Sequence, residues 1–235
     1  MTTKRRLVRG SFHNILDCFE RASSESIVEG GSWYPTARVW AAKVGTVLVD
    51  SGHVVLENMY DHVGSRIVLG AGIISAMSPQ TNWLQNKEMA LNFAETLDKP
   101  NWCTDINYKK ALAIVDTPIA PFGLQTVILE DYIAKILNGK KTTAFFYNIV
   151  NPFGQNNLPT IDRHAISIYL GRRCTYTELV RGLSGTANKT ISNAYIKASK
   201  LLETTPQIVQ AVTWVQWRKE IKGISQESEV KNNVS

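Results

Sequence analysis

Apolar residues recur at intervals of three and four along most of this 235-residue chain, the spacing of one face of an α-helix. The first such face lies near the N-terminus and consists of Phe12, Ile15, Leu16 and Phe19. Ser11 precedes it, where a serine hydroxyl can accept a hydrogen bond from the first turn. The same spacing predicts helices at residues 65–77, 83–97, 108–115 and 127–137, and another from Thr205–Pro206 onward.

A further helix is predicted to begin at Tyr34–Pro35, because proline suits the first turn of a helix. Its apolar face consists of Trp40, Val44, Val47 and Leu48. The adjoining segment 45–60 is rich in valine and its composition also fits a β-strand, but helical patterns flank it on both sides. The pattern therefore predicts an all-α fold.

No repeat or low-complexity tract divides the chain, and residues 1–222 are predicted to form a single two-lobed helical domain with interleaved lobes. The segments 98–107 and 116–125 contain prolines and are predicted to join the two lobes. Residues 223–235 are polar and lack aromatic side chains, so we expect them to form a disordered tail.

The composition, charge and apolar runs of the chain indicate which broad class of protein it belongs to. Hydrophobic residues make up 44% and charged residues 20% of the chain, proportions typical of soluble globular proteins. The net charge of +6 favours a polyanionic partner. The longest apolar run, residues 67–77, is too short to span a bilayer, and the basic opening residues do not lead into a signal peptide. We therefore expect a cytoplasmic protein without a membrane partner.

Three cysteines, Cys18, Cys103 and Cys174, lie far apart and are odd in number. They fit neither a disulfide framework nor a CxxC metal site, and a reducing compartment explains them most simply. The chain also lacks HExxH, Walker-type and GxGxxG motifs. We therefore predict free cysteines, no metal and no cofactor.

The candidate chemistry lies between Gly139 and Arg172. Lys141 opens one apolar helical segment, and Asp162, which is 21 residues further on, opens the next. A helix-loop-helix could bring both side chains to one cleft. An amine and a carboxylate facing one cleft suit cleavage of a bond whose transition state is cationic.

Each of these two residues also has a structural interpretation. An Asp at the start of a helix often serves only as an N-cap that accepts backbone N–H bonds. The two roles are compatible, because a helix N-terminus stabilises negative charge. A lysine near a helix start is usually a solvated charge, and Lys140 beside Lys141 offers an alternative register.

Two segments resemble the endonuclease III-like branch of the helix-hairpin-helix DNA glycosylase superfamily. SAMSPQTNWLQNKEMALNF resembles the family's Ser-Ala-Gln followed by an Asn-Lys helix start, and GKKTTAFFYNI with TIDRHA resembles its Gly-x-Lys-Thr-Ala helix and Val-Asp-Thr-His turn. The resemblance covers residues 65–97 and 137–173, and WYPTARVWAA and QAVTWVQWR also resemble phage-encoded members. The hairpin, residues 137–141, has one glycine fewer than the family's Leu-Pro-Gly-x-Gly, and no cysteine that could complete an iron–sulfur cluster follows Cys174.

The resemblance implies two helical lobes, with a central segment of about 65–135 and a hairpin segment of 137–173 that meet around one nucleotide. Asp162 would be the catalytic carboxylate, and Lys141 would correspond to the Schiff-base lysine that makes a glycosylase also a lyase. Further contacts to DNA or to the flipped nucleotide are predicted for Gln80, Asn82, Trp83, Gly139, Lys140, Arg163, His164, Arg172 and Arg173.

Several of these residues keep a second interpretation. Trp83 either stacks on a base, or the turn is simply polar and Trp83 packs into the protein core. His164 either contacts the nucleotide or orients the turn after Asp162. Trp214, Trp217 and Arg218 either pack between helices or meet a nucleic acid backbone.

The predicted function is that of a DNA glycosylase, which cleaves the N-glycosidic bond of a flipped base, and the phage resemblance implies a modified base. DNA is the predicted partner, and the sequence indicates no protein partner. One alternative is a DNA-binding protein that retains the fold without catalysis. The other is an N-glycosidase or transferase that acts on free nucleosides or nucleotides in the hypermodification of phage DNA.

Overall fold

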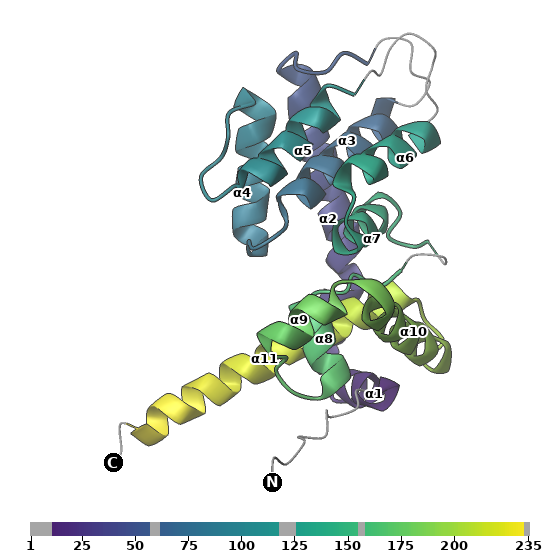
Figure 1. Ribbon diagram of the computed structural model, residues 1–235, viewed down its shortest axis with the longest axis vertical. Helices are drawn as coiled ribbons and strands as arrows, with labels where there is room; N and C mark the ends of the chain where they lie inside the picture. Colours follow the sequence, from purple (N-terminus) through teal and green to yellow (C-terminus); the bar gives the residue numbers. More distant parts are fainter. Residues whose placement is uncertain (1–10, 57–61, 118–125, 155–157, 233–235) are drawn as a thin grey trace. The chain divides into compact units, whose positions relative to one another are not determined.

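The computed structural model describes residues 11–56, 62–117, 126–154 and 158–232, and every regular element in these ranges is an α-helix (Figure 1). In chain order the helices are α1 (Phe12–Glu20), α2 (Ser24–Asp50), α3 (His62–Met77), α4 (Trp83–Thr96), α5 (Asp105–Val115), α6 (Thr126–Leu137), α7 (Lys140–Val150), α8 (Arg163–Leu170), α9 (Tyr176–Gly182), α10 (Gly185–Leu201) and α11 (Pro206–Asn232). The predicted all-α fold is confirmed.

The chain divides into two compact units. Unit 1 consists of residues 1–33 and 155–235, and unit 2 consists of residues 34–154. The prediction that segment 98–107 joins two lobes was wrong, because the segment connects α4 to α5 inside unit 2 and its last residues belong to α5. A proline in a polar segment indicates a connection between helices, but it does not show which helices the connection joins. Residues 118–125 of the second predicted connection lie outside the described residues.

Helix α2 begins earlier than its sequence predicts. It starts at Ser24 and includes Pro35 in its interior, where we expected Pro35 to occupy the first turn. A proline has no N–H to donate to the carbonyl four residues before it, which here is that of Gly31. The helix continues past this missing bond through Asp50, so the valine-rich segment 45–60 is helical in its first six residues.

Helix α3 forms the centre of unit 2. Every residue from Ile67 to Met77 is buried, and α4, α5, α6 and α7 all contact this helix (Figure 1). Helix α2 approaches it at backbone distance, because a Cβ on Gly45 would lie 1.8 Å from the carbonyl oxygen of Arg66 and one on Gly70 would lie 1.9 Å from that of Ala41. Only glycine permits this crossing.

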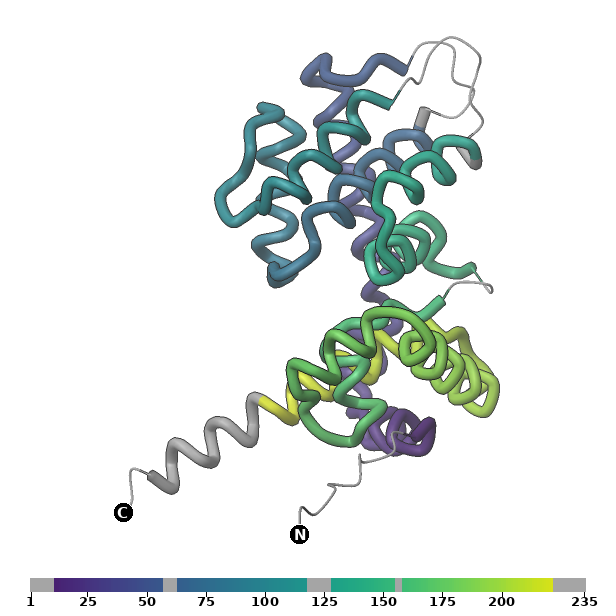
Figure 2. Tube along the Cα trace, in the orientation of Figure 1, coloured from purple at the N-terminus to yellow at the C-terminus, as the bar shows by residue number. Residues whose placement is uncertain are grey.

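Unit 1 packs the N-terminal helix against the C-terminal third of the chain. Helix α1 lies against α8, α10 and α11, as the purple and green-to-yellow segments of Figure 2 show. The core of this unit consists of Ile15, Cys18, Ile161, Ala165, Ile166, Ile168, Ile191, Tyr195, Ala198 and Val209. The buried side chains of α8, which follows Asp162, therefore belong to this core.

Helix α11 continues to Asn232, whereas residues 223–235 were expected to be a disordered tail. Residues 233–235 lie outside the described part of the chain. None of the helices in the described ranges contains a stretch that is both long and apolar enough to cross a bilayer.

Candidate functional site

Asp162 is the N-cap of α8, and its Oδ1 accepts a hydrogen bond from the backbone N–H of Ala165 at 2.8 Å. Its backbone is extended, with φ −117° and ψ −172°, as is typical of the residue before a helix. The side chain is half-buried, and within the described residues Oδ2 has no hydrogen-bond partner. The helix therefore fixes one carboxylate oxygen and leaves the other for a further interaction.

Residues distant in the sequence hold α8 at both ends. The fully buried Tyr195 of α10 donates from its hydroxyl to the carbonyl of Ala165 at 3.4 Å. Burial raises the pKa of this phenol, so it stays a donor. At the other end, the backbone N–H of Ser11 and the amide of Asn14 donate to the carbonyl of Tyr169, at 3.0 and 2.9 Å. These bonds fix the helix that carries Asp162 at its start.

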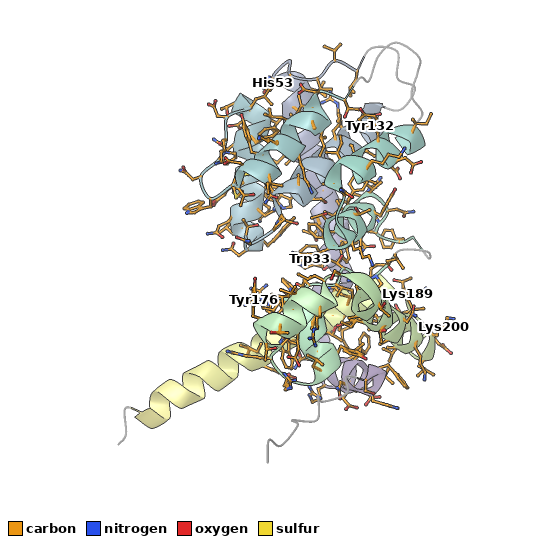
Figure 3. The ribbon with its side chains drawn as sticks, viewed as in Figure 1. Trp33, His53, Tyr132, Tyr176, Lys189 and Lys200 are labelled. Atoms are coloured by element: carbon orange, nitrogen blue, oxygen red, sulfur yellow. The ribbon has the colours of Figure 1, made fainter. Side chains whose placement is uncertain are left out.

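An aromatic cluster surrounds Trp214 of α11. The ring of His164, two residues after Asp162, meets this indole edge-on, with 6.2 Å between centroids and 84° between planes. Trp33 of α2, labelled in Figure 3, contacts the same indole at 5.9 Å and 71°. The guanidinium of Arg218 lies 4.4 Å from the ring centroid. These four residues, named here the Trp214 cluster, join α2, α8 and α11.

The three arginines predicted to contact DNA near Asp162 have different surroundings. Arg163 and Arg173 are exposed, and neither forms an ion pair with a described residue. Arg172 forms a bidentate pair with Glu178, with Nη2–Oε1 of 2.6 Å and Nη1–Oε2 of 3.0 Å. A phosphate would therefore have to compete with Glu178 for Arg172, whereas Arg163 and Arg173 need no such exchange.

The partner of Arg172 also has a structural task. Glu178 closes a capping box with Thr175 at the start of α9, accepting a hydrogen bond from the Thr175 N–H at 2.9 Å. The Arg172 guanidinium, and after it the Thr175 N–H, hold the pKa of the Glu178 carboxyl at about 2. The carboxylate is therefore charged throughout the physiological range.

Gly139, Lys140 and Lys141 lie where α6 and α7 meet, in unit 2. Asn138, the residue after α6, has φ +43°, and Gly139 is the N-cap of α7 without a side-chain capping bond. The hydroxyl of Thr142 donates to the carbonyl of Gly139 at 3.0 Å and closes this two-residue turn. Lys140 is exposed and Lys141 is half-buried.

The turn before α4 carries the three residues predicted to enter or read DNA. Gln80 is exposed and has φ +66°. Asn82 forms a capping box with Gln85: its Oδ1 accepts from the Gln85 N–H at 3.0 Å, and its own N–H donates to Gln85 Oε1 at 3.2 Å. Trp83 is half-buried, with the ammonium of Lys87 5.7 Å from its ring centroid. Asn82 therefore has a local role in starting the helix.

The predicted site residues divide between the two units. Unit 1 contains Asp162, Arg163, His164, Arg172 and Arg173, and unit 2 contains Gln80, Asn82, Trp83, Gly139, Lys140 and Lys141. The structure brings Asp162 and His164 together on the first turn of α8. The pairing of Lys141 with Asp162 stays a prediction.

The three cysteines are free thiols, with Cys18 and Cys103 buried. Burial raises the pKa of Cys18 to about 12, so its thiol is protonated at neutral pH and is not a nucleophile. Among the described residues, no three His, Cys, Asp or Glu side chains lie close enough together to hold a metal ion.

Comparison with known proteins places the chain in a family. Residues 1–221, which include every predicted site residue, match a family of unknown function, DUF7178. The chain belongs to this family. No curated protein and no solved structure matches the chain. Its function therefore has to be inferred from its own residues.

The sequence indicated no role for Trp33, and Trp214 and Arg218 fitted either helix packing or contact with nucleic acid. The structure shows that Trp214 does pack between helices, through its contacts with Trp33 and His164. The spacing of Trp214 and Arg218, which are four residues apart on one helix, was the available signal for their contact. Nothing in the sequence indicated that Trp33 and His164 meet the same indole.

Proposed function

We propose that this chain is a DNA glycosylase-like enzyme that cleaves the N-glycosidic bond between deoxyribose and a base flipped out of DNA. The observation that carries the proposal is the position of Asp162, a half-buried carboxylate at a helix N-terminus with one oxygen bound to the Ala165 N–H. The flanking residues 160–165 are those that resemble the catalytic turn of the glycosylase family.

In the proposed reaction, the bond between C1′ and the base nitrogen breaks, and its electron pair leaves with the base. The sugar becomes oxocarbenium-like, and the negative charge of Asp162 stabilises it. A water molecule then bonds to C1′, loses a proton through Asp162, and that proton reaches the departing base. The products are the free base and an abasic site, so the overall reaction is hydrolysis of the N-glycosidic bond by one water molecule.

The proposal includes a second route through Lys141. Its neutral amine would bond to C1′ as the bond to the base breaks, and one amine proton would pass to the departing base. The C1′–O4′ bond would then break, with the second amine proton passing to O4′, and the resulting Schiff base permits strand cleavage. Lys141 is half-buried at the start of α7, which suits a nucleophile better than the exposed Lys140 does. The target base is a modified pyrimidine in this proposal, which follows the resemblance to phage-encoded proteins.

The first test separates the catalytic role of Asp162 from its capping role. Asn and Ser both cap helices well, so Asp162→Asn and Asp162→Ser should each lose about 1 kcal/mol of unfolding free energy or less. Base release from DNA that carries modified pyrimidines should fall by about a hundredfold or more, because the carboxylate is gone. Chromatography of the released base and thermal unfolding measure the two effects. Full activity of either variant on a proven substrate would end this mechanism.

Lys141→Ala distinguishes the two nucleophiles. If the amine drives the lyase step, this variant loses strand cleavage and the borohydride-trapped DNA adduct while base release continues through water. Lys140→Ala, its exposed neighbour, is the matched control and should retain both. Equal loss in the two variants would indicate that the lysines act only through their charge.

A second candidate function is a DNA-binding protein without catalysis. The capping bond that Asp162 accepts from the Ala165 N–H favours it, because that bond alone accounts for an Asp at this position. In that case the unaltered protein would bind DNA without releasing a base, and Asp162→Asn would retain its folding and its DNA binding.

A further inference from the structure

Three consecutive residues of α11, Arg218, Lys219 and Glu220, carry charges, and two of these charges are neutralised inside unit 1. Lys219 Nζ lies 3.7 Å from a carboxylate oxygen of Glu29, and Glu220 pairs with Arg21 at 3.2 Å. Arg218 has no carboxylate within 4.0 Å among the described residues. Its charge therefore remains uncompensated beside two neutralised neighbours.

The Trp214 cluster holds Arg218 in place. The guanidinium lies 4.4 Å from the Trp214 ring centroid, and Trp33 and His164 each make a T-shaped contact with that indole. A cation over an aromatic face is attracted to the ring without using its N–H groups. Within the described part of the chain, no guanidinium N–H of Arg218 forms a hydrogen bond. The Trp214 ring therefore orients the guanidinium, whose five N–H groups have no acceptor among the described residues.

Other arginines of the chain show what a structural role looks like. Arg66 pairs with Asp50 at 3.1 Å, Arg21 pairs with Glu220, and Arg172 binds Glu178 with two hydrogen bonds. Each of these three connects two segments of its own unit. Arg218 differs from them because its stacking on Trp214 leaves its whole hydrogen-bonding edge for a ligand.

We infer that Arg218, positioned by Trp214, binds a backbone phosphate of the nucleic acid whose base is presented to Asp162. His164 connects the two, since it contacts Trp214 and lies on the first turn of α8. The guanidinium fork matches the oxygens of a phosphodiester. This inference rests on the proposed function, which supplies the anion, and it decides for Arg218 between the two roles that the sequence left open, helix packing and contact with a nucleic acid backbone.

The test measures binding of a short fluorescein-labelled DNA duplex by anisotropy at several salt concentrations. Arg218→Ala should weaken binding about tenfold and lower the slope of log affinity against log salt by about 1, because one phosphate contact is lost. Arg218→Lys should recover part of the affinity, since it restores the charge but not the fork. Lys219→Ala is the matched control, because it removes one positive charge from the adjacent residue, and it should retain the affinity of the unaltered protein.

Equal losses in Arg218→Ala and Lys219→Ala would overturn the inference, because the effect would then be one of net charge alone. Unchanged binding by Arg218→Ala, with thermal unfolding as in the unaltered chain, would also overturn it and leave the proposed function standing. Trp214→Phe tests the positioning role: it keeps a ring under the guanidinium but alters its support, and we expect a loss between those of Arg218→Lys and Arg218→Ala. If the unaltered protein does not bind DNA, the proposed function fails, and the inference fails with it.

Discussion

Unit 1 and unit 2 are of comparable size but differ in charge. Unit 1 carries 16 Lys and Arg against 10 Asp and Glu, whereas unit 2 carries 10 of each. The net charge of +6 therefore comes from unit 1 alone. Attraction of a polyanion at long range depends on such a sum of charges, so we expect unit 1, which also contains Asp162, to provide most of the salt-dependent affinity for DNA.

The two units resemble each other in how they pack. In unit 2, residues 67–77 of α3 are buried, and α3 meets α2 at backbone distance through Gly45 and Gly70. In unit 1, polar residues such as Gln207 and Thr213 are buried within the helix that bears the Trp214 cluster. Unit 2 buries polar side chains too, such as Asn86 and Asn148, and in unit 1 a Cβ on Gly30 would lie 2.4 Å from Val212 Cα. Net charge, rather than the polarity of the cores, therefore separates the two units.

The largest effect should come from breaking the helix crossing in unit 2. The added methyl group of Gly70→Ala would lie 1.9 Å from the Ala41 carbonyl oxygen, so α2 and α3 must separate. We expect a loss of about 3 kcal/mol of unfolding free energy or more, measured by urea denaturation. Gly31→Ala, where the added atom has nothing within 4 Å, is the control and should gain about 0.5–1 kcal/mol. Equal stability of the two variants would show that the crossing is looser than described.

Charge-reversal variants in each unit test whether the difference in net charge affects DNA binding. Helix α10 has no Asp or Glu, and its Lys189 and Lys200, labelled in Figure 3, are exposed. Reversing both to Glu should weaken DNA binding about tenfold or more at low salt. The same change at the exposed Lys109 and Lys135 of unit 2 alters net charge equally and should have a much smaller effect. Anisotropy titrations measure both, and equal losses would contradict a separate role for unit 1.

The smallest effect is expected for the Arg172–Glu178 ion pair of unit 1. Glu178→Gln keeps a side chain suited to the capping box of α9 but removes the charge that meets Arg172. Because solvent screens the pair, we expect a loss of about 1 kcal/mol at neutral pH. The folded pKa of Glu178, about 2, is below the ordinary 4.5. Its contribution is therefore present above pH 4.5 and is lost as the pH falls toward 2.

Thermal unfolding of the two proteins across that window checks the sign of the effect. The unaltered chain should be more stable than Glu178→Gln above about pH 4.5, and this difference in stability should disappear as the pH falls from about 4.5 to about 2. A difference that stays constant through this window would mean that the Arg172–Glu178 charge pair does not stabilise the unit.

Many helix boundaries followed from the sequence because their causes are local. Ser11, Asn82 and Asp162 each precede a helix in the sequence, and each accepts the backbone bond that starts it. The uniformly apolar run at residues 67–77 likewise indicated a helix, and it became the buried centre of unit 2. Caps and hydrophobic spacing act within a few residues, so they can be read without the fold.

Other features depend on residues that only the tertiary structure brings together. The sequence did not predict that α2 passes through Pro35, that Glu178 pairs with Arg172, or that Trp33 and His164 meet at Trp214. The sequence alone determined an all-helical protein with a carboxylate at the start of one helix. The tertiary structure decided which of its charges are neutralised internally and which stay uncompensated, because ion pairing depends on distances of a few ångströms between helices that the local pattern does not position.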